Sequence, residues 1–226
     1  MPLVVAAVRE DDLLRYAQVY EAAFSPGSGP AISAVITPPS ARTPEHEAAA
    51  VQETLARAQK RFTSSTVFFR KVTDTDTNET IAFARWEIYH EERTWDQVME
   101  DTKQSPPPKG VNEKAWNAIF GYIQDARREF MGTRPHCLLG ILMADPAHQG
   151  RGAGAMLLKD GTQKADQDSL ECQLEASRAG QKLYERFGFK VVKEQIFHLQ
   201  DYGGEGDDSN CVMIRPARSS QISADI

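Results

Sequence analysis

The stretch Gln149-Gly150-Arg151-Gly152-Ala153-Gly154 says more about the fold of this 226-residue chain than any other segment. It follows an apolar run over residues 138–143, which predicts a buried strand, and it opens a helical pattern over residues 153–165. A glycine-rich turn between a strand and a helix presents free backbone N–H groups at the positive end of the helix dipole. The segment therefore predicts a binding site for a diphosphate group.

The overall composition is that of an ordinary globular protein, with 41% hydrophobic and 26% charged residues. Lysine and arginine total 26 against 32 aspartates and glutamates, which gives a net charge of −6. This balance argues against a nucleic-acid partner, because phosphate neutralisation needs clustered basic residues. No apolar run is long enough to span a bilayer and no targeting segment is visible, so we expect no membrane partner and a cytoplasmic or nuclear location.

The cysteines and histidines predict no metal site. Cys137, Cys172 and Cys211 are far apart, form no CxxC pair and lie in apolar stretches, so we expect them to behave as small core residues. The five histidines are scattered along the chain without a helical i, i+4 pair.

The order of strand and helix patterns predicts a mixed α/β (α+β) fold, with one domain over residues 1–216 and a polar tail over 217–226. Residues 25–42 are expected to form a long loop. An insertion over 91–135 should begin with a polar part and continue as a helix from Asn112, with Trp116 and Phe120 in its core stripe. The acidic residues Glu205, Asp207 and Asp208 should form a solvated hairpin tip. Strands are expected over 3–8, 66–72, 79–89, 138–143, 171–176, 189–199 and 211–214, and helices over 13–24, 44–62, 112–130, 153–165 and 181–187.

Two elements beyond the glycine turn identify a family. The segment Leu174-Glu175-Ala176-Ser177 comes first, and Leu183-Tyr184-Glu185-Arg186-Phe187-Gly188-Phe189 follows it. Together with the turn, which fits the pattern Q/R-x-x-G-x-G/A, they resemble the acetyl-CoA motif and the Y-x-x-x-G-F element of the GNAT superfamily of N-acetyltransferases. Residues 106–128, 135–136 and 145–146 resemble acetyltransferase-like sequences of filamentous fungi, so the resemblance covers about half the chain.

The resemblance implies the acyl-CoA N-acyltransferase fold, with helices on both faces of a mixed sheet that a β-bulge splays at the cofactor site. It implies acetyl-CoA as co-substrate, with the pantetheine arm bonded to the backbone of Leu142, Met143 and Ala144, the last of which stands where the family usually has valine. Gln149, Gly150, Arg151, Gly152, Ala153 and Gly154 would hold the diphosphate through the backbone, which leaves the Arg151 side chain to solvent. Ser177 stands where many members carry asparagine, and it would either contact the pantetheine or cap the next helix.

The resemblance also implies catalytic roles. Tyr184 would donate a proton to the leaving CoA sulfur, and the alternative is a tyrosine that only packs in the core. The general base is expected to be Glu87, beside Trp86 on the strand that borders the acceptor cleft, and the alternative is a solvated edge glutamate. Glu175 is a second candidate for the base. Asp145 is expected to organise the turn before Pro146.

The implied function is transfer of acetyl from acetyl-CoA by direct attack to a small amine, such as an arylalkylamine, a polyamine or an amino metabolite, and the alternative acceptor is a protein lysine or N-terminus. The net negative charge slightly favours a cationic acceptor. One alternative is a non-catalytic CoA-binding module. Another is an NAD(P)-binding oxidoreductase, because residues 150–155 also fit G-x-G-x-x-A with Glu175 further along. Two features argue against the oxidoreductase. Five residues separate the strand from the glycines, whereas the dinucleotide-binding turn is tight, and the chain after Glu175 is too short for the rest of a doubly wound sheet.

Overall fold

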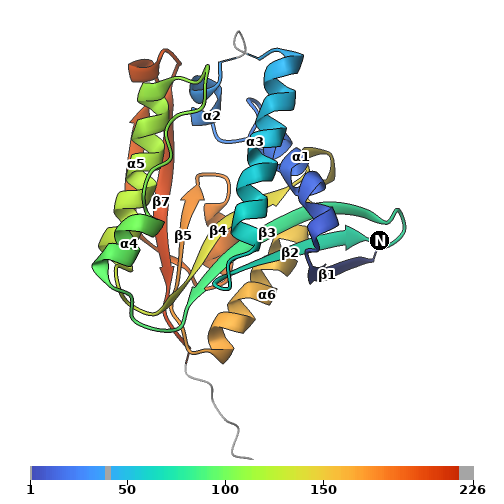
Figure 1. The fold of residues 1–226 in the computed structure, drawn as a ribbon, viewed down its shortest axis with the longest axis vertical. Helices are drawn as coiled ribbons and strands as arrows, with labels where there is room; N and C mark the ends of the chain where they lie inside the picture. The colour runs from blue at the N-terminus through green and yellow to red at the C-terminus, as the bar shows by residue number, and fades with distance from the viewer. Residues whose placement is uncertain (1, 39–41, 219–226) are drawn as a thin grey trace, which may run out of the picture.

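The protein is described here by a computed structural model that covers residues 2–38 and 42–218. Its sheet has seven strands in the order β1-β2-β3-β4-β5-β7-β6 (Figure 1). Neighbouring strands of this sheet are antiparallel except for the parallel pair β4–β5. The strands are β1 (Leu3–Ala7), β2 (Val67–Asp74), β3 (Glu79–Tyr89), β4 (His136–Ala144), β5 (Cys172–Ser177), β6 (Lys190–His198) and β7 (Asp207–Arg215).

Helices cover both faces of the sheet, as the sequence predicts. On one face α1 and α3 pack on Phe69, Phe83 and Met143. On the other face α6 packs on Ala84 and Trp86, which alternate with Phe83 along β3. None of the described helices is both long and apolar enough to cross a bilayer. The helices are α1 (Leu13–Ala23), α2 (Ile32–Ile36), α3 (Pro44–Phe62), α4 (Trp95–Asp101), α5 (Glu113–Phe130), α6 (Ala153–Gln167) and α7 (Gln181–Arg186).

The two long helices beside the site begin where their capping residues predict. The Thr43 hydroxyl accepts from the His46 amide at 3.2 Å, and Pro44 occupies the first helical position of α3. The Asn112 side chain accepts from the Ala115 amide at 3.3 Å and starts α5. These local signals set the two helices that later form the opposite walls of a cavity.

Two expectations for the loops are wrong, those for residues 25–42 and for Asp208. The segment 25–42 contains α2, whereas the insertion is helical as expected, with α4 in its polar first part. Asp208 is 6% exposed and therefore does not form a solvated tip. Its carboxylate accepts a hydrogen bond from the Ile32 amide at 2.9 Å. This amide lies at the start of α2, where a helix offers no backbone acceptor of its own. Residues 39–41 of the loop and 219–226 of the tail lie outside the described residues.

A β-bulge in β4 opens the sheet, as expected from the resemblance. Arg85 of β3 pairs with Ile141 and Trp86 pairs with Leu139, so Gly140 is left without a partner on β3. The pairing of β4 with β5 ends at Leu139, and beyond this residue the two parallel strands diverge. A dinucleotide-binding fold needs a largely parallel sheet, and this sheet has a single parallel pair among its described strands, so the oxidoreductase alternative does not fit.

Candidate active site

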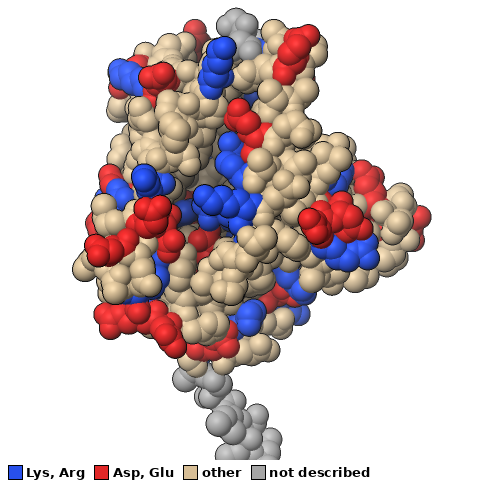
Figure 2. All heavy atoms as spheres, viewed as in Figure 1, with Lys and Arg blue, Asp and Glu red and all other residues tan. Residues whose placement is uncertain are grey.

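The point where β4 and β5 diverge lies between two cavities. The larger, about 1090 Å³, is bounded by α1, α2, α3, α5 and residues 104–111, with β4, β5 and α7 at its base. Figure 2 shows this side of the molecule hollowed between α3 and α5, with lysine and arginine atoms gathered in the hollow. The smaller, about 450 Å³, is lined by the end of β4 and by Gln149. Both cavities share the lining residues Phe24, Pro30, Leu142, Ser177 and Asp208.

The glycine turn has the backbone geometry that an anion site requires. Gly150 and Gly152 have φ angles of 75° and 85°, and a Cβ on either residue would meet no atom within 4 Å. The first hydrogen bond of α6 joins the Met156 amide to the Gly152 carbonyl at 3.1 Å. Within the described chain, the amides of Gly152, Ala153 and Gly154 have no hydrogen-bond acceptor. The turn therefore offers three free donors at a helix N-terminus, next to open space.

The Arg151 side chain is not left to solvent, which corrects the expectation. Its guanidinium pairs with Asp74 and contacts His148 Nδ1 at 3.0 Å. Asp74 is 1% exposed, so this buried carboxylate needs a cation beside it. The expectation for Asp145 is confirmed, since its side chain accepts from the Ala147 amide at 2.9 Å and caps the short helix Pro146–His148. Arg151 and Asp145 thus fix the turn from both sides.

The end of β4 supplies backbone groups to the smaller cavity. Leu142, Met143 and Ala144 pair with β3 on one side and have no strand partner on the side from which β5 has diverged. All three line the smaller cavity together with Gln149. Because strand residues direct their N–H and C=O groups alternately to either side, part of this backbone faces the gap. The structure therefore brings these four predicted cofactor residues together.

Tyr184 of α7 lines the larger cavity and is 8% exposed. Its ring lies edge-on to Phe189, with ring centroids 6.2 Å apart. Burial raises the pKa of Tyr184 above its ordinary value, so the phenol stays protonated at neutral pH. Ser177 lines both cavities. Gly180 is the cap residue of α7, so the alternative in which Ser177 caps that helix is wrong.

Glu87 is 5% exposed, which rules out a solvated edge glutamate. Its Oε1 lies 3.3 Å from Arg61 Nη1 and 3.5 Å from Arg85 Nη2, and Tyr89 donates to its Oε2 at 3.1 Å. Burial raises the pKa of Glu87, but Arg85, Arg61 and Arg127 outweigh burial and leave the pKa below its ordinary value. Glu87 is therefore an ionised carboxylate beneath the arginines, and it is not among the residues that line the cavity.

Glu175 lies in the wall of the larger cavity and is held by Arg127. Both side chains are largely buried, and Arg127 Nη2 donates to the Glu175 carboxylate at 2.7 Å. Burial lowers the pKa of Arg127, but Glu175 outweighs burial and raises it. Arg127 comes from α5 and Glu175 from β5, so this ion pair spans the cavity base.

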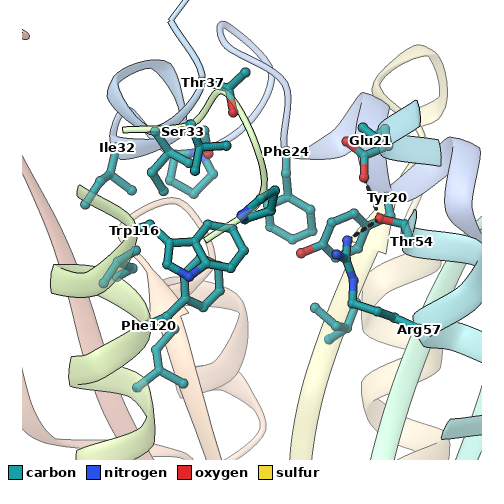
Figure 3. Close-up of a pocket in the computed structure, with 18 of the residues that line it drawn as sticks. Tyr20, Glu21, Phe24, Ile32, Ser33, Thr37, Thr54, Arg57, Trp116 and Phe120 are labelled. Atoms are coloured by element: carbon teal, nitrogen blue, oxygen red, sulfur yellow. Dashed lines mark hydrogen bonds between the residues drawn. The ribbon is translucent and has the colours of Figure 1, made fainter. Parts of the chain in front are cut away.

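The arginines of the larger cavity were not predicted from the sequence, and its aromatic residues were expected in the helix core rather than on a binding surface. Trp116 and Phe120 are partly buried and line the cavity instead of filling the helix core (Figure 3). Their rings lie 4.1 Å apart between centroids and face Thr54 and Arg57 of α3 across the cavity. Two signals were present in the sequence: arginines four residues apart at 57 and 61, and Arg85 with its alternate neighbour Glu87 inside an apolar strand.

The three buried cysteines are core residues, as expected. In the described part of the chain, no group of three or more histidine, cysteine, aspartate or glutamate residues is arranged to hold a metal ion.

Comparison with known proteins identifies the fold and the family. Three solved structures superpose over nearly their whole length: arylalkylamine N-acetyltransferase 2 from Aedes aegypti (TM-score 0.63, 13% identity, 96% of this chain and 100% of that one), polyamine N-acetyltransferase from Drosophila melanogaster (0.62, 14%, 95% and 100%) and PaiA N-acetyltransferase from Thermoplasma acidophilum in complex with coenzyme A (0.50, 14%, 96% and 99%). At these identities the likeness concerns the fold. No curated protein sequence matches the chain.

The family model of the acetyltransferase (GNAT) domain matches residues 72–198, which is more than half of the chain and includes the glycine turn, the diverging strands and Tyr184. The protein belongs to the GNAT family of N-acetyltransferases, whose acyl donor is acetyl-CoA.

Proposed function

We propose that this enzyme transfers acetyl from acetyl-CoA to the amine of a small molecule by direct attack. One observation carries the proposal: the free amides of the turn come shortly after Gln149, which lines the smaller cavity together with the open edge of β4, and that cavity shares lining residues with the larger one, where Tyr184 lies. A volume of about 1090 Å³ between helices suits a small acceptor. The arylalkylamine and polyamine N-acetyltransferases named above have the same fold and act on small amines, which supports this choice.

The cofactor would enter at the turn. The amides of Gly152, Ala153 and Gly154 would receive the diphosphate, and the pantetheine arm would follow β4 past Ala144, Met143 and Leu142. Ser177, which lines both cavities, would contact the arm from the β5 side. The thioester would then reach the place where β4 and β5 diverge, next to Tyr184.

The chemistry needs no nucleophile on the enzyme. The acceptor nitrogen attacks the thioester carbon, a C–N bond forms, and the C–S bond breaks as the tetrahedral intermediate collapses. The sulfur then takes a proton, for which Tyr184 is the proposed donor. Its phenol is protonated at neutral pH, and its hydroxyl makes no hydrogen bond to another described residue, so it is free to reach a ligand.

The acceptor must lose a proton before it attacks. For an amine with an ordinary pKa near 10.4, deprotonation at neutral pH costs about 4–5 kcal/mol. We propose Glu87 as the base, acting through water because the cavity does not reach it directly, with Glu175 as the alternative. Both carboxylates are held in ion pairs with arginine, so both are fixed in position.

Two measurements test the proposal. Isothermal titration with acetyl-CoA should show binding in the micromolar range, and absence of binding at high micromolar ligand would discard the cofactor path. A thiol-release assay across a panel of arylalkylamines, polyamines and amino acids should then detect turnover with at least one member. Binding of acetyl-CoA without turnover of any amine would favour the non-catalytic alternative.

A further inference from the structure

The base of the larger cavity carries an excess of positive charge. The arginine cluster, which we define as Arg61, Arg85 and Arg127, shares two carboxylates, Glu87 and Glu175. Arg85 lowers the pKa of Arg61, and burial lowers it further, so these cations repel one another. Arg85 and Arg127 are largely buried and Arg61 is partly exposed, and repulsion between such cations is unfavourable unless an anion compensates it.

A fourth arginine extends the charged surface up the wall. Arg57 precedes Arg61 by one helical turn on α3 and points into the cavity (Figure 3). It donates to the Thr54 hydroxyl at 2.6 Å, while its ion pair with Glu53 is long, at 3.7 Å. Three carboxylates, Glu21, Glu47 and Glu53, also line the cavity at this level, so the excess of positive charge is confined to its base.

Arg85 has unused hydrogen-bonding capacity. Its Nε is buried and has no hydrogen-bond partner in the described part of the chain. Among the described residues, its ion-pair partner within 4 Å is Glu87, at 3.5 Å. A guanidinium binds a carboxylate best through two parallel N–H groups, and this guanidinium has not used its Nε–H.

Arg85 also lies at the place where chemistry would occur. Its Nη2 is 2.6 Å from the position that a Cβ on Gly140 would occupy, so glycine at the bulge makes room for the guanidinium. Gly140 marks the end of the β4–β5 pairing. A molecule bound by Arg85 would therefore sit beside the point that the thioester reaches in the proposed function.

Above the arginines two sides of the cavity are aromatic. Trp116 and Phe120 form one wall, and Tyr20 and Phe24 of the α1 end approach from another side (Figure 3). Aromatic walls of this kind stabilise an apolar or aromatic body through burial and ring contacts. The cavity thus combines an anion site at its base with an apolar site above it.

We propose that the acceptor is an amine that also carries a carboxylate and an apolar side chain, as an apolar or aromatic amino acid does. The carboxylate lies against Arg61 and Arg85. The apolar group lies between two walls, one formed by Trp116 and Phe120 and the other by the end of α1. The amine then faces the thioester. This inference rests on the proposed function, narrows its substrate class, and disfavours polyamines despite the net negative charge of the chain.

Matched pairs of acceptors test the inference. Phenylalanine is compared with phenethylamine, and tryptophan with tryptamine, because each pair differs only in the carboxylate. We expect kcat/KM to be at least about tenfold higher for the carboxylate-bearing member, the ratio that one charge-assisted hydrogen bond supports. Equal rates, or faster rates for the decarboxylated amines, would overturn the inference.

Variants assign the preference to the cluster. Arg61→Gln should remove most of the preference, and Arg61→Lys should retain part of it because the charge remains. Arg61 lies on an exposed helix end, so these variants should fold. The control is Arg70→Gln. Arg70 lies on β2 and pairs with Asp160 on the opposite, α6 face of the sheet, so this variant should keep the preference. A preference that survives Arg61→Gln unchanged would also overturn the inference.

Binding measurements separate this inference from the proposed function. CoA-loaded protein is titrated with N-acetylphenylalanine and with N-acetylphenethylamine, which needs no turnover. N-acetylphenylalanine should bind at least about tenfold more tightly than N-acetylphenethylamine, and Arg61→Gln should abolish the difference. If this result is obtained although no amine is acetylated, the proposed function fails and the anion site stands. If the two ligands bind alike, the anion site is refuted whatever the enzyme acetylates.

Discussion

Replacing Gly152 with alanine tests whether the glycine turn holds the cofactor. Gly152 has φ 85° and ψ 1°, a left-handed conformation that costs an L-residue about 1–2 kcal/mol. A Cβ here would meet no protein atom within 4 Å, so the cost in the free protein is conformational and not steric. At about 2–4 °C per kcal/mol for a chain of this size, the variant should unfold about 2–8 °C lower.

The same substitution should weaken acetyl-CoA binding. If the turn instead relaxes from the left-handed conformation in the free variant, binding must restore it, and the 1–2 kcal/mol then appears as a Kd raised by about 5–30-fold in place of the fall in melting temperature. The added methyl group also occupies open space beside the free amides of Ala153 and Gly154. Isothermal titration with acetyl-CoA measures Kd, and differential scanning calorimetry measures the melting temperature.

Gly203→Ala is the matched control. Gly203 has φ 84° and ψ 19°, and a Cβ on it would also meet no atom within 4 Å. Its strain should therefore equal that of Gly152→Ala, with a similar fall in melting temperature and an unchanged Kd for acetyl-CoA. The reasoning is refuted if both variants bind acetyl-CoA as the wild type does while both lose stability.

Three further predictions concern single side chains. Tyr184→Phe should lower kcat by about 100-fold or more with little change in acetyl-CoA affinity, and an unaltered rate and pH profile would remove its role as proton donor. Glu87→Gln should lower kcat at least about tenfold in the same assay, whereas an unchanged kcat with a raised acceptor KM would limit Glu87 to holding Arg61 and Arg85 in place. Burial lowers the pKa of His136 from 6.5 to about 4, so the unfolded chain takes up a proton between these pH values and the folded protein does not. His136 therefore lowers the free energy of unfolding by about 3 kcal/mol at pH 4 and has no such effect above pH 6.5. In urea unfolding, the free energy of unfolding should fall more steeply with decreasing pH for the wild type than for His136→Gln.

Local signals predicted most of the backbone. Asn112 and Thr43 each start a helix through a side-chain bond to an amide three residues on, so the sequence window that predicts the helix contains both partners. Asp208 shows where such reasoning ends, because its partner, the Ile32 amide, is 176 residues away. The hydrophilic, glycine-containing segment around Asp208 predicted that its side chain would be exposed to solvent. Only the packing of α2 against the hairpin of β6 and β7 buries it.

The sequence by itself determined which residues form the proposed cofactor half of the site. The glycines of the turn, the strand before it and Tyr184 lie in one continuous stretch, and their roles depend on backbone torsions and short-range periodicity. The acceptor half was decided by tertiary structure alone. Arg61 comes from α3, Arg85 from β3 and Arg127 from α5, and Trp116 faces α3 across a cavity, so their meeting depends on long-range packing that no local pattern encodes. Charge that is dispersed along the chain is concentrated at the proposed anion site only when these three elements pack around the diverging strands.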